Sequence, residues 1–163
     1  MVVWSMSGEM GEKVKIRGEV KVVIRDRKTN KVLAEKIYKN VITDGGIGVF
    51  ASRIANPWST AYWCLELGIG TGTPSSSDTN LFGPIATTRK SGTRSKVGNN
   101  QIQYYVRYLP EEANGYTYTE LGIWENCNID LSGGTLINHL LIEPAIEKTS
   151  DILVDFYVNI YLS

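Results

Sequence analysis

The chain has 163 residues, of which 42% are hydrophobic and 21% charged, and its 17 Lys and Arg residues balance 17 Asp and Glu residues. A chain of this length is expected to form one domain that buries roughly 70% of its unfolded surface, so no disulfide framework is needed. The neutral total disfavours nucleic acid as a partner, and no run approaches the roughly 18 apolar residues of a membrane span, so a membrane is not an expected partner either.

The first predicted elements are an arm and a hairpin. Residues 1–12, which include Trp4, have no hydrophobic period and predict a flexible amino-terminal arm. Over residues 13–25 apolar and mostly basic side chains alternate, and this period of two is typical of a half-buried strand. Turn-forming residues 26–31 lead into a second strand over residues 32–42, so the two strands are predicted to form a hairpin.

One short helix is predicted after this hairpin. Thr43 or Asp44 offers an N-cap, and Asn56-Pro57 ends the helix. Between them the apolar residues recur at the i, i+3, i+4 and i+7 spacing of one helical stripe, namely Ile47, Phe50, Ala51 and Ile54.

The middle of the chain alternates between buried and polar segments. Residues 62–67 predict a short buried strand. The Gly- and Ser-rich residues 68–79 follow without an apolar period, and a loop of this length is typically functional or mobile. Leu81 and Phe82 are expected to attach the far end of the loop to the body. The polar, Thr-rich residues 85–96 predict an exposed edge strand.

The second half of the chain is predicted to consist of strands. They cover residues 102–108, 116–124, 135–142 and 152–162. Glu143-Pro144 predicts an interruption after the third of these strands, and the fourth alternates apolar residues with polar or phenolic ones. Residues 13–163 therefore predict a single all-β domain, a β-sandwich or jelly-roll-like body of about eight mainly antiparallel strands with one short helix.

The two cysteines show no framework spacing. Cys64 lies in an apolar run and is expected to be a buried small hydrophobe. Cys127 stands between two Asn residues and is expected in a loop. We expect both thiols to be free, with a Cys64–Cys127 bridge as the alternative.

No set of catalytic residues stands out. The Gly68–Gly72 segment has the glycine content of a phosphate-binding loop, but Thr73 replaces the third spaced Gly and no helix follows. His139, the single histidine, lies within a predicted strand and is expected to be a half-buried structural residue. One His and two distant Cys are too few for a zinc site of usual spacing. The sequence therefore predicts no catalytic residue, no cofactor and no metal, and a chain that is not an enzyme.

Aromatic residues give the only candidate surface. Flat rings exposed on a β domain stack on sugar rings or anchor a protein interface, whereas ordinary strand packing is the alternative. The predicted interface or ligand surface consists of Trp4, Tyr105, Tyr116, Tyr118 and Trp124.

Charges are segregated along the chain. Residues 13–39 carry ten Lys or Arg and three acids, whereas residues 108–163 carry nine acids and one base. Basic and acidic strands that pair within one sheet account for this pattern, and so do repeated contacts between copies. We expect a closed homo-oligomer, with a trimer as the first candidate.

Turn and glycine positions across residues 20–163 resemble those of virion structural proteins of tailed phages and archaeal viruses. The motifs that carry the resemblance are residues 40–46 (NVITDGG), 65–72 (LELGIGTG), 76–81 (SSDTNL), Arg89, 119–124 (TELGIW), 133–134 (GG) and 146–149 (IEKT). The resemblance implies a non-enzymatic structural protein of the virion, of the tail-fibre, baseplate or capsid-decoration type, with other virion proteins as partners. The alternative is a carbohydrate-binding or adhesin-type module that binds a glycan through exposed Tyr and Trp residues.

Overall fold

The structure, a computed structural model, describes residues 15–56 and 62–163. The predicted arm over residues 1–12, with Trp4, lies outside these ranges. The strands are β1 (Ile16–Asp26), β2 (Val32–Ile42), β3 (Tyr62–Gly68), β4 (Thr93–Val97), β5 (Gln101–Tyr108), β6 (Thr117–Cys127), β7 (Thr135–Glu147) and β8 (Ile152–Leu162). One α-helix, α1 (Asp44–Ala55), and one 3₁₀ turn, Ala86–Thr88, complete the described elements. The predicted all-β class, with eight strands and one short helix, is confirmed.

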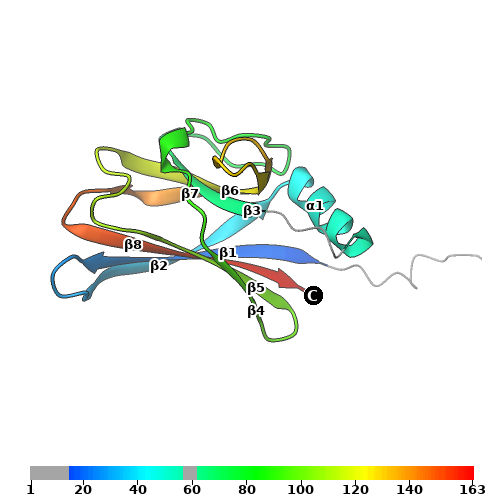
Figure 1. Cartoon of the computed structure of the whole chain (residues 1–163), viewed down its shortest axis with the longest axis horizontal. Helices are drawn as coiled ribbons and strands as arrows, with labels where there is room; N and C mark the ends of the chain where they lie inside the picture. Colours follow the sequence, from blue (N-terminus) through cyan, green and yellow to red (C-terminus); the bar gives the residue numbers. More distant parts are fainter. Residues whose placement is uncertain (1–14, 57–61) are drawn as a thin grey trace, which may run out of the picture.

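The strands form one antiparallel sheet in the order β3-β6-β7-β2-β1-β8-β5-β4, which curls into a half-barrel (Figure 1). The sheet turns at β2, because this strand pairs with β1 over most of its length but with β7 only through Val41 and Ile42. We call β2, β1, β8, β5 and β4 the first half-sheet, and β3, β6 and β7 the second half-sheet. The continuous ladder through β2 makes the fold a half-barrel in place of the expected sandwich of two separate sheets.

The core lies between the two half-sheets. As the alternation predicted, Val22 of β1 and Phe156 of β8 are buried on its inner side, and they pack in one cluster with Leu121 of β6. The rings of Tyr104 and Tyr108 are also buried, and their hydroxyls donate across the core to the carbonyls of Trp63 and Thr88, both at 2.7 Å. Burial raises the pKa of Tyr104 to about 12. These hydroxyls satisfy their hydrogen bonds without reaching water.

Two strand predictions need correction. The predicted interruption at Glu143-Pro144 is wrong, since β7 continues through this cis peptide bond. The β6–β7 register leaves residues 142–145 without ladder partners, so Pro144, which lacks an N–H, costs no hydrogen bond there. The edge strand predicted over residues 85–96 is limited to β4, because residues 84–90 instead follow the edge of β3 through two isolated bridges.

The helix begins and ends where the sequence predicts. The Thr43 hydroxyl accepts the Gly46 N–H at 3.0 Å, and Asn56 is the C-cap. Gly46 is the buried contact of α1, since a Cβ there would lie 2.3 Å from the Ile137 carbonyl oxygen. In the apolar stripe, by contrast, Ile47 is 51% and Ile54 85% exposed. The close approach at Gly46 turns much of this stripe away from the sheet.

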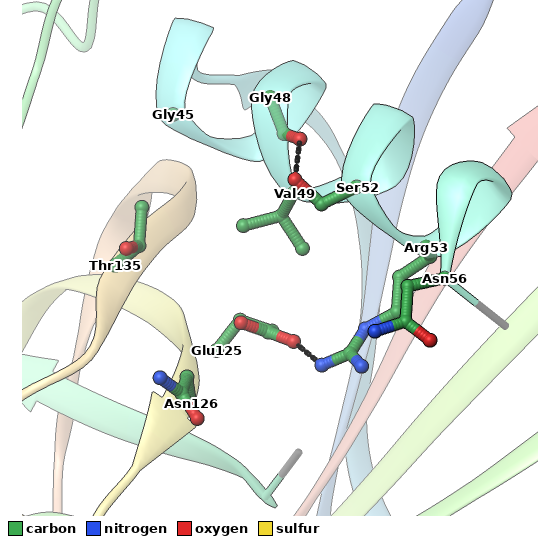
Figure 2. A pocket seen from close by; sticks show the side chains of 9 residues that line it. All are labelled: Gly45, Gly48, Val49, Ser52, Arg53, Asn56, Glu125, Asn126 and Thr135. Carbon is green, nitrogen blue, oxygen red and sulfur yellow. Dashed lines mark hydrogen bonds and ion pairs between the residues drawn. The ribbon is translucent and has the colours of Figure 1, made fainter. Parts of the chain in front are cut away.

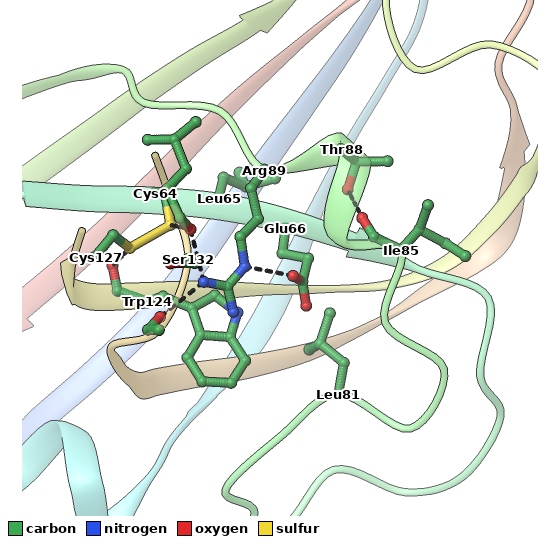
Figure 3. A network of polar contacts seen from close by, with 12 residues as sticks. Cys64, Leu65, Glu66, Leu81, Ile85, Thr88, Arg89, Trp124, Cys127 and Ser132 are labelled. Atoms are coloured by element: carbon green, nitrogen blue, oxygen red, sulfur yellow. Dashed lines mark hydrogen bonds and ion pairs between the residues drawn. A yellow bond between two sulfur atoms is a disulfide. The ribbon is translucent and has the colours of Figure 1, made fainter. Parts of the chain in front are cut away.

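The two cysteines form a disulfide (Figure 3). The expected free thiols are therefore wrong, and Cys127 is the last residue of β6, not part of a loop. The pairing of β3 with β6, which has a register irregularity between Tyr62 and Trp63, places Cys64 and Cys127 at a Cα–Cα distance of 6.6 Å. This irregularity cannot be read from the spacing of the cysteines. The disulfide belongs to a second, smaller apolar cluster with Leu81, Trp124 and Leu136.

Candidate interaction surface

The outer face of the first half-sheet carries a continuous row of aromatic and charged side chains. Alternation places these residues opposite the core-facing side chains of the same strands. This surface, which we call the outer platform, consists of Arg17, Glu19, Lys21 and Arg25 on β1, Asp155, Tyr157, Asn159 and Tyr161 on β8, and Gln101, Gln103, Tyr105 and Arg107 on β5. Its four bases outnumber its two acids, so the platform favours an acidic or aromatic partner.

Aromatic rings and cations are interleaved across the outer platform. The Tyr105 and Tyr157 rings stack at a centroid distance of 4.9 Å and an angle of 28°. The Arg17 guanidinium lies 4.3 Å from the centroid of the Tyr161 ring. Such rings are rigid, so a partner that stacks on them orders few side chains.

A buried carboxylate fixes the centre of the outer platform. Asp155 is fully buried and accepts hydrogen bonds from Arg107 Nε at 2.6 Å, the Tyr105 hydroxyl at 2.8 Å and Arg25 Nε at 3.1 Å. Burial alone raises the pKa of the Asp155 carboxyl, but these donors outweigh it and hold the pKa below its usual value. Burial and the bond to Asp155 raise the pKa of Tyr105 to about 12. The platform therefore keeps its charges and its shape near neutral pH.

Amide side chains extend the outer platform toward the end of β8. Gln101 Nε2 and Gln103 Nε2 donate to Asn159 Oδ1 at 3.0 and 3.1 Å. These amides keep further donors and acceptors for a partner. The platform thus offers stacking, hydrogen bonds and cations to a partner.

Among the predicted surface residues that the structure describes, the ring centroids of Tyr116 and Tyr118 lie 5.9 Å apart, whereas Tyr105 and Trp124 lie on other parts of the sheet. Tyr105 belongs to the outer platform, and Tyr116 is 42% exposed at the start of β6. Tyr118 is 1% exposed in the main core, and Trp124 is 7% exposed beneath the Arg89 guanidinium, which lies 4.4 Å from the ring centroid. The placement of Tyr118 and Trp124 on an exposed surface is therefore wrong.

An irregularity in β6 turns Tyr118 into the main core, whereas Trp124 lies on the face opposite Leu121 and Ile123 and is covered by Leu81 and Arg89. The β6–β7 register shifts between Tyr118 and Glu120 and again between Ile123 and Trp124, so strict alternation fails along β6. Sequence reasoning also left out Tyr157 and Tyr161. Their signal was present, because both alternate with the apolar residues of the last strand.

His139 lies in a polar centre beneath the long loop. The ring is fully buried, with Nδ1 2.7 Å from Asp78 Oδ2 and Nε2 2.7 Å from Glu120 Oε2. Burial alone lowers the pKa of His139, but the two carboxylates outweigh it and raise the pKa above 6.5. In the protonated imidazole both ring nitrogens donate, one to each carboxylate. The Phe82 ring covers the imidazole at a centroid distance of 4.6 Å, so the centre is closed and serves to hold the loop.

The glycine-rich loop already binds an internal anion. The Glu120 carboxylate accepts the N–H groups of Gly70, Phe82 and Gly83 at 3.0, 2.9 and 2.6 Å. A Cβ on Gly70 would lie 2.3 Å from the Gly83 nitrogen, so the two loop segments approach as only glycine permits. The backbone donors that a phosphate would need are taken by a side chain of β6.

A second buried ion pair holds the segment that follows this loop (Figure 3). Arg89 Nε donates to Glu66 Oε2 at 2.5 Å, and Arg89 Nη1 donates to the carbonyls of Leu131 and Gly133 at 2.8 and 2.7 Å. Figure 3 shows the guanidinium between the Glu66 carboxylate and the Trp124 ring. The loop over residues 68–79, expected to be functional or mobile, is thus held by Glu120 at Gly70 and by His139 at Asp78, and the segment after it by Arg89.

A polar recess lies between α1 and the ends of β6 and β7 (Figure 2). It has a volume of about 480 Å³, and in Figure 2 Arg53 and Glu125 point toward each other across it and form an ion pair. The Ser52 hydroxyl donates to the Gly48 carbonyl at 3.0 Å within the helix. These polar groups are bonded to one another, and no histidine or cysteine lines the recess.

We expect the His139 centre to make stability depend on pH. Because folding raises the pKa of His139, its contribution is complete below pH 6.5 and is lost as the pH rises through the higher folded value. Folding lowers the pKa of Glu120 and Asp78, so their contributions are present above pH 4.5 and 3.8 and are lost at lower pH. The free energy of unfolding should therefore be highest between about pH 4.5 and 6.5.

Urea denaturation across this pH range measures the effect. Each unit by which folding raises the pKa of His139 contributes about 1.4 kcal/mol. The His139→Asn variant should lose the decline above pH 6.5. An unchanged alkaline decline in that variant would assign it to other groups.

Comparison of the chain with protein-family models, with curated proteins and with solved structures finds no match. In residues 15–56 and 62–163, no three His, Cys, Asp or Glu side chains gather in a metal-binding arrangement. No described helix is long and apolar enough to span a bilayer.

Proposed function

We propose that this protein is a non-enzymatic structural component of a virus particle, located on the virion, which acts through contacts with other virion proteins. The resemblance of its turn and glycine motifs to virion proteins supports the proposal. The Cys64–Cys127 disulfide agrees with it, because disulfides persist on virion surfaces and are rare in reducing compartments.

The outer platform is the observation that carries the proposal. Protein interfaces are enriched in Tyr and Arg, and these residues supply most of the energetic hot spots. Here Tyr105, Tyr157 and Tyr161 stand with Arg17 and Arg107 on one face of a rigid sheet. We assign this face to the contact with a neighbouring virion protein.

Binding to particles tests the proposal. The purified chain should sediment with virions of the source virus that lack this protein, and Tyr157→Ala should weaken that binding about tenfold or more. Tyr62→Ala is the matched control, since Tyr62 is 65% exposed at the start of β3, off the platform. Failure of the wild-type chain to bind, or equal losses in the two variants, would overturn the proposal.

A glycan-binding module is the second candidate. The stacked Tyr105–Tyr157 pair beside the amides of Gln103 and Asn159 favours it, because sugar rings stack on aromatic faces while amides bind their hydroxyls. A glycan array tests it with the same variants. Glycan signals that disappear in Tyr157→Ala but remain in Tyr62→Ala would favour this function over the virion role.

A further inference from the structure

The edge of β2 that faces away from β1 is long and exposed, and it carries both apolar and charged side chains. On one side β2 pairs with β1, but on the other only Val41 and Ile42 pair with β7, so within residues 15–56 and 62–163 the edge formed by residues 32–40 has no strand partner. Leu33 and Ile37 on this edge are 59% and 57% exposed. Such an edge is a template for pairing with another strand.

The hydrogen bonds of β2 show which backbone groups are available. The Thr43 N–H donates to the Ile137 carbonyl of β7 at 3.1 Å, and Val41 pairs with His139. Odd-numbered residues of β2 therefore direct their N–H and C=O groups toward the β7 side. Because these directions alternate along a strand, Glu35, Ile37 and Lys39 present theirs on the free edge.

The side chains of this edge are complementary to themselves. In an antiparallel pair of β2 strands centred on Ile37, each Glu35 faces Lys39 of the second copy, and each Lys36 faces Tyr38 of the second copy. Lys36 already lies 4.8 Å from the Tyr38 ring within one chain, a cation–π contact that the second copy would repeat. Registers centred on Lys36 or Tyr38 place Glu35 and Lys39 opposite apolar residues instead.

We propose that two copies of this chain pair through their β2 edges about a twofold axis at Ile37, which joins the two first half-sheets into one. In this register three residue pairs exchange backbone hydrogen bonds between the copies: Ile37 with Ile37, and Glu35 with Lys39 twice. Each pair forms two bonds, which gives about six in all. Such a contact is isologous, so it gives a dimer in place of the expected trimer. It goes beyond the proposed virion role and holds whether or not that role is correct.

A groove leaves room for the added strand on the inner side of β2. It has a volume of about 200 Å³, and its lining includes Val22, Ile24, Tyr38, Pro144 and Ile146. Inner-face side chains of the second β2 strand point toward this apolar groove and cover its lining. The splayed end of β7 therefore gains the Tyr38 ring and the aliphatic part of Lys36 of the second copy as neighbours on dimerisation.

Cross-linking at the axis tests the register. Opposed Cα atoms in a hydrogen-bonded antiparallel pair lie about 5.5 Å apart, so Ile37→Cys should cross-link between copies with a short bifunctional thiol reagent. The native cysteines give no background because they are bonded to each other. Lys28→Cys, in the exposed β1–β2 turn and far from the axis, is the control that should react with the reagent but not cross-link.

Charge reversal tests the pairing itself. Analytical ultracentrifugation of the wild-type chain should show a concentration-dependent dimer. Glu35→Lys and Lys39→Glu should each weaken dimerisation about tenfold or more, because like charges then face each other twice. Mixing the two variants restores both opposite-charge pairs, so the mixture should form a heterodimer as tight as the wild-type dimer.

Three results would overturn the proposal. They are a chain that stays monomeric at every concentration, equal cross-linking of the two cysteine variants, and a variant mixture that does not associate.

Deletion of residues 1–14 can give a fourth result that would overturn the proposal. If the Ile37→Cys thiol of a monomer reacts only after this deletion, the amino-terminal segment covers the edge instead. All these measurements use the purified chain without virions, so their failure is separate from failure of the proposed function.

Discussion

Replacing Glu120 by Ala is expected to lower the free energy of unfolding by about 4 kcal/mol, because the change leaves a buried cation and three buried donors without their shared acceptor. The Glu120 side chain is fully buried and binds the N–H groups of Gly70, Phe82 and Gly83 as well as the His139 ring. The loss should act first on the loop, which this carboxylate connects to β6.

Two measurements separate the local effect from the global one. Urea denaturation gives the loss of stability, and amide hydrogen exchange at Gly70 and Gly83 should rise in Glu120→Ala under native conditions. Glu112→Ala is the matched control. Its carboxylate is only partly buried in an ion pair with Lys90, so the loss there should stay below about 1 kcal/mol. Unchanged exchange of the loop amides in Glu120→Ala would contradict the assigned role.

Much of the fold is encoded locally and was predictable. The second and last strands end where the alternation of apolar residues ends, at Val32–Ile42 and Ile152–Leu162. The helix has its cap at Thr43 because a short hydroxyl side chain there satisfies a helix N–H that has no other partner. In each case the signal lies within about a dozen neighbouring residues.

The curvature of the sheet and the disulfide depend on contacts that no local pattern contains. β2 joins the two half-sheets only because Val41 and Ile42 meet β7, almost a hundred residues later in the chain. Similarly, Cys64 and Cys127 meet through the β3–β6 pairing. Periodicity identifies strands but not which strands are neighbours.

The candidate surface was only partly predictable for a related reason. Tyr105 and Tyr157 alternate with apolar residues in regular strands, so their faces follow from the sequence. In β6 a bulge turns Tyr118 to the core face, whereas Trp124 stays on the opposite face and is buried there because the segment with Leu81 and Arg89 covers it. Residues 66–69 and 120–123 share the sequence Glu-Leu-Gly-Ile. The two segments pair with each other, and each buries its glutamate against a basic side chain, Arg89 or His139.

The outer platform and the free edge of β2 belong to the same half-sheet. Pairing of two β2 strands would therefore place two platforms on the same face of one extended sheet. A partner that binds this face would engage both copies, which raises its apparent affinity without new types of contact. Weakening of particle binding by Lys39→Glu, together with its recovery when this variant is mixed with Glu35→Lys, is the expected sign of this coupling. Glu35→Lys alone does not test the coupling, because Glu35 forms an ion pair with Lys21 of the platform at 2.8 Å.

Removing the disulfide is expected to have an effect as large as that of Glu120→Ala. The bond closes a loop with a sequence separation of 63 residues, and the chain-entropy model assigns about 4 kcal/mol to such a cross-link. Cys64→Ala/Cys127→Ala is the suitable variant, because both positions are buried and a serine hydroxyl there would add its own desolvation cost. The closed loop spans β3 to β6, so the loss should appear as a lower midpoint of the whole unfolding transition.

Reduction of the wild-type chain provides the matching experiment. Urea denaturation with reductant should shift the wild-type midpoint down to that of the double variant, whose own midpoint should not move. Thiol titration in denaturant should find no reactive thiol before reduction and two afterwards. Two reactive thiols in the unreduced, unfolded chain would show that the bond is absent. In that case the apolar contacts around Leu81 and Trp124 would hold this cluster without a covalent bond. The double alanine variant should then be destabilised only by the small cavities left in the cluster.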